Sequence, residues 1–333
     1  MRRATLSKLH VVLLGLIFGL WAVPYGTAHS SFQNTNRRQS RERQKPVVTQ
    51  SANAETPRSQ VPIPHPVSFR DVPGRGLLVR AWVNSAGPFN FAVDTGAGAT
   101  LLSPQVVSEA HVAIKRDRGS TISGLSGVMT SAREAGVSRF AIGDSENLLP
   151  VKGLVIVTNG LPSGVDGVLD PTEAFAPLGY VIDLPRGELE AFDPHVSPVQ
   201  LSEQPQDGAV VQWAREGHGR RPFVLLNSGE RALLDTGSNL GYAVREGRAP
   251  DQNRSGYVIH DVGGGSVEAR RVAPATIGIG SLTLRRIPTD VVFGAEADAP
   301  VLLGLGALRP FRIRFDPVHH LIEIAPGASR RRT

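Results

Sequence analysis

Apolar and polar residues alternate at every second position in several short stretches of the chain. The alternation covers residues 77–84, residues 89–93 and residues 312–316. A period of two places successive side chains on opposite faces of a β-strand, whereas a helix repeats every 3.6 residues. The chain lacks long stretches of helical period, and its 36 glycines and 25 prolines interrupt the apolar runs. The pattern predicts an all-β protein with short strands and short helices.

One series of sequence features occurs twice, in the same order. Each copy has an apolar strand ending in Asp-Thr-Gly, then a glycine-containing hairpin, an apolar pair and a closing apolar segment. The first copy comprises residues 89–103, 123–127, 166–170 and 180–192, and the second comprises residues 230–244, 262–266, 300–304 and 311–324. An ordered series of this kind is a strong sign of duplication. The repeat predicts two lobes, residues 66–198 and residues 199–327.

The charge of the chain is concentrated at its ends. The formal net charge is +6, but nine of the 36 basic residues lie in residues 1–58 and three more in the basic tail, residues 328–333. Residues 59–329 then contain 24 basic and 28 acidic residues. Because DNA- and RNA-binding domains present a basic face, this mildly acidic region argues against a nucleic-acid partner. The absence of cysteine excludes disulfides, cysteine nucleophiles and thiolate metal sites.

Two segments precede the predicted lobes. In residues 1–28, basic residues are followed by an apolar run at residues 11–23, which is shorter than the ~20 residues of a typical membrane-spanning helix. This pattern favours a cleaved signal peptide over a membrane anchor, and predicts an exported protein that is periplasmic or secreted. Association with a membrane through residues 11–23 is the alternative. Residues 29–65 are polar and proline-containing, which predicts a disordered linker or pro-segment.

The chemically informative residues are in the two Asp-Thr-Gly turns. In each turn a strand fixes the carboxylate, a threonine hydroxyl can hydrogen-bond within or across the turn, and glycine lets the backbone approach closely. A pseudo-twofold relation between the copies would bring the two aspartates face to face. The candidate residues are Asp94 and Asp235, supported by Thr95, Gly96, Thr236 and Gly237.

These two turns, together with the Leu302-Leu303-Gly304 element, resemble the retropepsin-like and pepsin-like aspartic peptidases over residues 70–325. The sequence looks more like two fused retropepsin-like units than a pepsin. The resemblance implies a bilobal, pseudo-twofold acid-protease fold with the active site between two β-barrel lobes. It also implies β-hairpin flaps that close over an extended polypeptide substrate. By position, the flap candidates are Gly124, Gly127, Gly263 and Gly264.

The function that follows from the resemblance is hydrolysis of peptide bonds by an aspartic endopeptidase. Two close carboxylates hold one proton between them, so one can activate water while the other protonates the substrate. The reaction requires no metal and no cofactor. Because both aspartates belong to one chain, a monomer is sufficient to build the site. The alternative is a catalytically inactive, protease-like module of the cell envelope that binds peptides or proteins.

The first copy departs from the family pattern in two respects. Asp170 stands where the second copy has Gly304, and the sequence Asp-Pro-Thr-Glu predicts that it caps a helix rather than acting as a third catalytic carboxylate. Neither flap candidate contains the tyrosine familiar from pepsin-like enzymes, since Tyr257 precedes the second hairpin at a different place. The His319-His320 pair is expected in a solvent-facing turn and not in a metal site.

Overall fold

A computed structural model describes residues 11–13, 61–150, 153–214, 219–245, 256–295 and 299–327. The predicted signal peptide or anchor lies outside these residues except for Val11–Leu13, which form strand β1. The predicted linker, apart from residues 61–65, and the basic tail also lie outside them. Among the described residues, no helix has the length and apolar character needed to cross a membrane.

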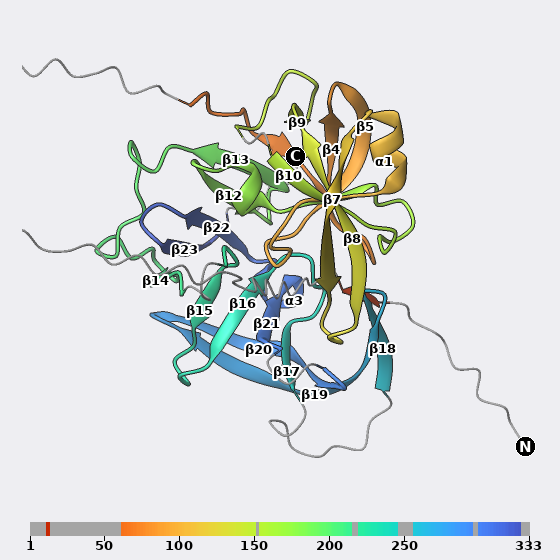
Figure 1. The fold of residues 1–333 in the computed structure, drawn as a ribbon. Helices are drawn as coiled ribbons and strands as arrows, with labels where there is room; N and C mark the ends of the chain where they lie inside the picture. The colour runs from red at the N-terminus through yellow and green to blue at the C-terminus, as the bar shows by residue number, and fades with distance from the viewer. Residues whose placement is uncertain are drawn as a thin grey trace, which may run out of the picture. The chain divides into compact units, whose positions relative to one another are not determined.

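The first lobe is built on a nine-stranded sheet (Figure 1). Its strand order is β3-β4-β5-β11-β6-β10-β8-β7, with β9 paired to β4. The strands are β3 (Arg70–Val72), β4 (Gly76–Val83), β5 (Ala86–Val93), β6 (Leu101–Leu102), β7 (Ala113–Ser123), β8 (Met129–Val137), β9 (Phe140–Ile142), β10 (Gly153–Val157) and β11 (Gly167–Leu169).

The second lobe is built on an eight-stranded sheet with the order β1-β18-β19-β20-β17-β21-β16-β15. Its strands, besides β1, are β15 (Phe223–Leu225), β16 (Arg231–Asp235), β17 (Tyr242–Arg245), β18 (Gly256–Asp261), β19 (Ser266–Ile279), β20 (Leu282–Phe293) and β21 (Val301–Gly304). Strand β1 pairs in parallel with β18 at the edge of this sheet.

The two lobes share one strand topology. In the first lobe the path runs β5-β11-β6-β10-β8-β7, and in the second it runs β16-β21-β17-β20-β19-β18. The direction of each pairing also matches: parallel, antiparallel, parallel, antiparallel and antiparallel in both lobes. The duplicated sequence features therefore occupy equivalent places in two equivalent sheets.

A third, six-stranded sheet combines strands from both halves of the chain. Its order is β14-β23-β22-β12-β13-β2. The strands are β2 (Val67–Ser68), β12 (Gly179–Asp183), β13 (Glu188–Phe192), β14 (Ala209–Gln212), β22 (Phe311–Asp316) and β23 (Leu321–Pro326). At its centre β12 pairs with β22, and the rings of Tyr180 and Phe315 stack with centroids 4.6 Å apart. The closing segments of the two sequence copies thus form a common sheet.

The helices are short, and the first two begin after residues whose side chains cap them. Helix α1 (Pro104–Glu109) is capped by Ser103, whose hydroxyl accepts a hydrogen bond from the Val106 N–H. Helix α2 (Pro171–Ala174) follows Asp170, and α3 (Leu305–Leu308) follows Gly304. The predicted cap role of Asp170 is confirmed, because its carboxylate accepts hydrogen bonds from the N–H groups of Thr172 and Glu173.

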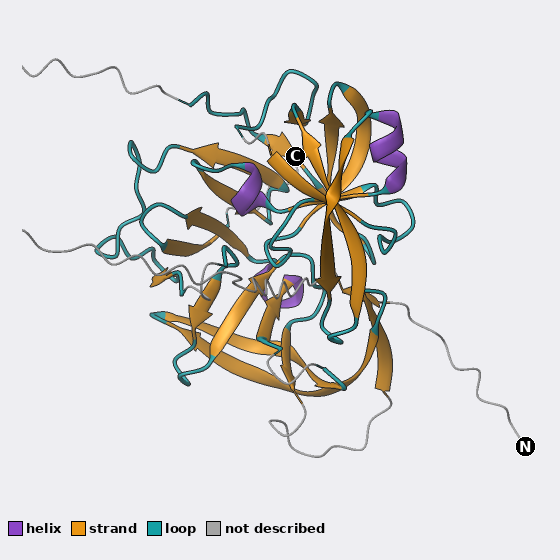
Figure 2. Ribbon diagram, viewed as in Figure 1, coloured by secondary structure: helices purple, strands orange, loops and turns teal. Residues whose placement is uncertain are grey.

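The all-β prediction is confirmed, and strands dominate the described chain (Figure 2). The expectation of uniformly short strands is wrong for β19 and β20, which are 14 and 12 residues long. Their pairing shifts register between Val272 and Ala275, around Pro274. A β-bulge tolerates a proline that donates no hydrogen bond, so a proline there bends a long strand rather than ending it.

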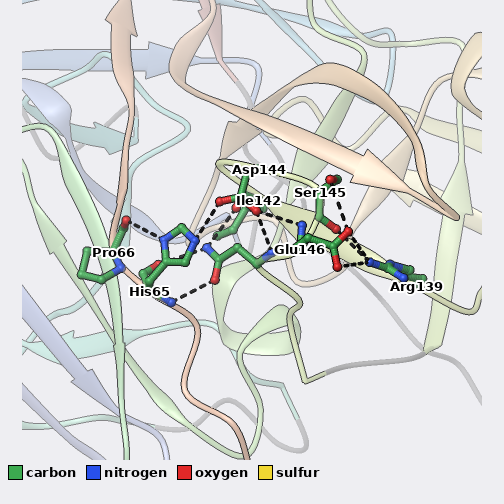
Figure 3. A network of polar contacts seen from close by, with 8 residues as sticks. His65, Pro66, Arg139, Ile142, Asp144, Ser145 and Glu146 are labelled. Carbon is green, nitrogen blue, oxygen red and sulfur yellow. Dashed lines mark hydrogen bonds and ion pairs between the residues drawn. The ribbon is translucent and has the colours of Figure 1, made fainter.

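The start of the first lobe is fixed to a turn after β9 (Figure 3). The backbone N–H of His65 donates to Asn147 Oδ1 at 2.9 Å, and the Asn147 side chain donates back to the His65 carbonyl at 3.1 Å. His65 Nε2 lies 2.8 Å from Asp144 Oδ2, in an ion pair with both side chains more than half exposed. Exposed ion pairs contribute little to stability. The two hydrogen bonds of the buried Asn147 side chain therefore hold His65 in place.

Candidate active site

The two candidate aspartates end equivalent strands. Asp94 directly follows β5, and its N–H donates to the carbonyl of Leu169 on the parallel neighbour β11 at 3.0 Å. Asp235 is the last residue of β16 and lies opposite Gly304 of β21. A buried central strand leaves its final side chain little freedom, so both carboxyls are held in fixed positions.

The threonines of the two turns bind each other across the lobes. The Thr95 hydroxyl donates to the Leu234 carbonyl at 2.6 Å and accepts the Thr236 N–H at 3.1 Å. The Thr236 hydroxyl donates to the Val93 carbonyl at 3.0 Å and accepts the Thr95 N–H at 3.1 Å. Of the two arrangements that the sequence left open, the hydroxyls adopt the one across the turns. This reciprocal set fixes one turn against the other.

The glycines allow the two carboxyls to approach. The N–H groups of Gly96 and Gly237 donate to Oδ1 of their own aspartates at 2.8 and 2.9 Å. A Cβ atom on Gly96 would lie 2.9 Å from the Asp235 carboxyl carbon, closer than real side chains pack. The carboxyl of the second lobe therefore lies directly against the turn of the first, and any larger residue at position 96 would push it away.

Burial raises the pKa of both carboxyls. Each aspartate is 0% exposed. Burial raises the pKa of Asp94 well above its usual value, and the nearby charge of Asp235 raises it further. Burial raises the pKa of Asp235 to about 6, while hydrogen bonds and the charge of Arg221 limit the increase. Neither Oδ2 has another hydrogen-bond partner among the described residues, so a proton shared by the pair satisfies both.

This arrangement can act as an acid and a base at the same time. A pair that holds one proton contains one carboxylate, which can accept a proton, and one carboxylic acid, which can donate one. The charge of Asp170 is among the effects that raise the pKa of Asp94, and the charge of Arg221 is among those that lower the pKa of Asp235. The two carboxyls therefore have different charged surroundings although the strands that carry them are equivalent.

Asp170 differs from its counterpart Gly304 because the two turns differ in sequence. A Cβ on Gly304 would lie 2.7 Å from the Ser238 carbonyl oxygen, which already accepts the N–H of Leu305. In the first lobe the residue after Asp170 is Pro171, which has no N–H to donate. The Asp170 carboxylate instead caps α2 through Oδ1, while Oδ2 is buried without a partner among the described residues.

The free energy of unfolding is expected to fall as pH rises from about 4 to 7. Burial raises the folded-state pKa of Asp170 to about 7 and that of Asp235 to about 6, against an ordinary value near 3.8. In this window the folded protein keeps protons that the unfolded chain releases, so each retained proton lowers stability by about 1.4 kcal/mol per pH unit. Chemical unfolding followed by circular dichroism at several pH values measures the slope.

Two variants of Asp170 separate its charge from its cap. Asp170→Asn keeps the cap and removes the buried charge, so it should flatten the slope and match the wild type near pH 4. Asp170→Ala loses the cap and should be about 1 kcal/mol less stable near pH 4. A wild-type slope that is unchanged in Asp170→Asn would contradict the assignment of the slope to this residue.

The predicted flap glycines lie at the tips of two hairpins that touch each other. Gly124 and Gly127 are in the turn between β7 and β8, and Gly263 and Gly264 are in the turn between β18 and β19. A Cβ on Gly124 would lie 2.1 Å from the Asp261 carboxyl carbon, at the end of β18. In Figure 1 the end of the β7–β8 hairpin reaches β18.

Each tip also places an apolar side chain in the core of the opposite lobe. Leu125 of the first hairpin belongs to the cluster that contains Leu240, five residues after Asp235. Val262 of the second hairpin belongs to the cluster that contains Ala97, three residues after Asp94. Each tip thus packs in a cluster that includes a residue close in sequence to an Asp-Thr-Gly turn.

Three residues of this region were not singled out from the sequence. Arg221 is buried near Asp235, and nothing in the surrounding Arg-Arg-Pro-Phe segment marks it. Asp261 and Ser126 form a hydrogen bond between the two tips. An aspartate directly before a glycine-rich turn often accepts backbone N–H groups, and this signal could have identified Asp261.

The remaining candidates lie away from the dyad. Tyr257 packs against the core of the second lobe, and Asp290 is among the neighbours that raise its pKa. His319 Nδ1 lies 2.9 Å from Asp316 Oδ2 in the turn after β22. Across the described ranges, no group of three or more histidine, aspartate or glutamate side chains is arranged to hold a metal ion. A small pocket in the first lobe is lined mainly by apolar side chains, and neither aspartate lines it.

One known protein family matches part of the chain that contains the first Asp-Thr-Gly turn. Residues 79–169, from β4 to the end of β11, match the sequence model of the family described as Aspartyl protease. Comparison with curated proteins gave no significant match. The matched region contains the first Asp-Thr-Gly turn, the first hairpin tip and the strand that supports Asp94. This match, together with the all-β fold and the paired aspartates, supports a likeness of the chain to retropepsin-like aspartic peptidases.

Proposed function

We propose that this protein is an aspartic endopeptidase in which Asp94 and Asp235 are the catalytic pair. The observation that carries the proposal is the pair of buried carboxyls at the ends of equivalent strands, whose turns are joined by reciprocal threonine hydrogen bonds. Burying two acidic groups next to each other lowers the stability of the fold, and such groups are concentrated at functional sites. Catalysis by a shared proton is a function that uses them. The match of residues 79–169 to an aspartyl protease family gives independent support.

We assign Asp235 as the initial base and Asp94 as the initial acid from the different charges around the two carboxyls. The Asp235 carboxylate takes a proton from water, whose oxygen attacks the peptide carbonyl carbon, while Asp94 gives its proton to the carbonyl oxygen. Asp94 then recovers a proton from the resulting diol as the C–N bond breaks, and Asp235 gives its proton to the leaving nitrogen. The products are a carboxylic acid and an amine, and both aspartates return to their initial states.

We infer that the two lobes are two fused retropepsin-like units, with boundaries near residues 66–198 and 199–327. The shared strand order of the two sheets supports this inference. The substrate would bind as an extended strand, its main chain forming hydrogen bonds and alternate side chains filling pockets. A protein of this kind, exported or anchored by its first residues, would act on polypeptides outside the cytoplasm.

The proposal is tested by incubating the full chain with an unstructured protein between pH 3 and pH 9. Mass spectrometry of the products should show internal cleavage that increases as pH rises through about 6, where Asp235 ionises, and declines when Asp94 also loses its proton. The specific activity should not depend on protein concentration, because one chain supplies both aspartates. Activity that rises with concentration would contradict the single-chain site.

A non-catalytic, peptide-binding role is the second candidate. The observation in its favour is that both carboxyls are fully buried and that the two hairpin tips are hydrogen-bonded to each other. Binding of unstructured protein without cleavage at any pH, equal in the wild type and in Asp94→Asn, would support this role over the endopeptidase.

A further inference from the structure

The two hairpin tips are joined by one carboxylate. Asp261 Oδ2 accepts the N–H of Ser126 in the first hairpin at 2.8 Å, and Asp261 Oδ1 accepts the N–H of Gly265 in its own turn at 3.0 Å. The Asp261 side chain thus connects β18 of the second lobe to the β7–β8 turn of the first. We refer to Asp261 and these two N–H groups as the tip latch.

We propose that Asp261 is a positioning residue whose latch holds both hairpins closed and so controls access of a polypeptide to the dyad. The kinetic part of this inference rests on the proposed function, whereas the latch itself rests on the contacts alone. Asp261 does not touch the dyad in the contacts described, so it acts through the hairpins.

The latch is strong because of its burial and charge. Asp261 is 6% exposed, and its carboxylate accepts two backbone N–H groups with good geometry. Hydrogen bonds with a charged partner contribute more than neutral ones, and they strengthen where water is excluded. No lysine or arginine forms an ion pair with Asp261 in the described part of the chain, so the N–H groups are its principal partners.

Other contacts make the two tips open together. The Thr130 hydroxyl donates to the Gly263 carbonyl across the same junction. Leu125 and Val262 are each buried in a cluster of the opposite lobe. Neither hairpin can lift without withdrawing its apolar residue and breaking the bonds to the other, so opening is a single coupled event.

A polypeptide cannot reach the aspartates in the closed state. Asp94 and Asp235 are 0% exposed, and the tips pack in the same clusters as residues that follow the two catalytic turns. When only a fraction of a protein is competent to bind, its apparent affinity falls by that fraction. The strength of the latch should therefore set the apparent substrate affinity and leave the chemical step nearly unchanged.

Hydrogen exchange of the full chain tests the latch without any substrate. Asp261→Ala should speed exchange of backbone amides at residues 123–129 and at residues 261–266 by about ten- to a hundredfold, the loss expected for charge-assisted hydrogen bonds. Asp261→Asn retains an acceptor oxygen and should give a smaller increase. Exchange at residues 123–129 that is unchanged in a folded Asp261→Ala protein would overturn the proposal.

A matched control uses an aspartate in another hairpin. Asp183 accepts the Arg186 N–H within the turn between β12 and β13, and the described hydrogen bonds of its side chain do not reach either tip. Asp183→Ala should leave exchange at both tips as in the wild type. If Asp183→Ala accelerates the tips as much as Asp261→Ala does, the effect is general destabilisation and the latch is refuted.

An engineered disulfide provides a second, independent test. A Cβ on Gly265 would lie 2.0 Å from Ser126 Oγ, so cysteines at these two positions would face each other, and the chain has no other cysteine. The oxidised Ser126→Cys/Gly265→Cys protein should lose cleavage by at least about a hundredfold, and a reductant should restore it. Equal cleavage by the oxidised and reduced forms would overturn the gating role.

The separate effects on KM and kcat give a third test of the latch. Relieving the latch with Asp261→Ala should raise kcat/KM by about ten- to a hundredfold through a lower KM, with little change in kcat. A fall in kcat at unchanged KM would overturn the role in access. If the wild type cleaves nothing while the exchange results hold, the proposed function fails and the latch stands; if it cleaves and exchange is unaffected, the latch alone fails.

Discussion

Replacing Asp94 or Asp235 by asparagine is expected to lower kcat/KM for cleavage of an unstructured protein by at least about a thousandfold. Either change removes the shared proton, because an amide neither takes a proton from water nor gives one to the carbonyl oxygen. The two single variants and the double variant should lose nearly the same activity, since the pair works as a unit. Cleavage is measured from product peptides at the pH where the wild type is most active.

The fold of these variants should survive. An asparagine Oδ1 can still accept the N–H of Gly96 or Gly237, which holds the side chain in place. Removing one of two buried acidic groups also removes their repulsion, so stability near neutral pH should be equal to or above that of the wild type. Asp183→Asn, in a turn of the six-stranded sheet, serves as the control that should keep full activity. Wild-type activity in Asp94→Asn would remove Asp94 from the mechanism.

Replacing Thr95 or Thr236 by valine is expected to lower the free energy of unfolding by about 2–5 kcal/mol. Valine keeps the shape of threonine but has no hydroxyl. Loss of the Thr95 hydroxyl leaves the Leu234 carbonyl without its donor and the Thr236 N–H without its acceptor, both in a buried region. Urea unfolding measured near pH 5 gives the change in stability.

The threonine pair also fixes the relative position of the two carboxyls. Each threonine variant should therefore lose cleavage activity in addition to stability, even under conditions where it is fully folded. Thr283→Val, at an exposed position on β20, is the matched control and should change stability by less than about 0.5 kcal/mol. The double variant should lose less than the sum of the single losses, because the two hydroxyls belong to one network.

Several features of the molecule could be predicted from the sequence because they depend on local order. The alternation at residues 77–84 and 89–93 corresponds to β4 and β5, and the sequence Asp170-Pro171-Thr172-Glu173 predicts a capped helix that the structure contains. The repeated Asp-Thr-Gly turns predict a paired acidic site, because duplicated units place equivalent residues at equivalent strand ends. For the strands, the helix cap and each turn taken alone, the deciding interactions are made within a few residues along the chain.

Other features depend on residues far apart in the sequence. The bond from Ser126 to Asp261 joins positions 135 residues apart, and Thr95 and Thr236 are 141 apart. A turn aspartate such as Asp261 has the same local pattern whether it caps only its own turn or also binds another hairpin. The long strands β19 and β20 were also missed, because Pro274 and Pro288 indicate breaks unless a bulge and a paired neighbour accommodate them.

The sequence by itself determined the fold class, the position of both acidic turns and the role of Asp170 as a cap, because strand period, turn chemistry and helix capping are local properties. The tertiary structure alone decided that the threonines bind across the lobes, that both carboxyls are fully buried with raised pKa values, and that a carboxylate fastens the hairpin tips. Burial and proximity arise only when distant segments pack together, and these two quantities control the electrostatics of the site.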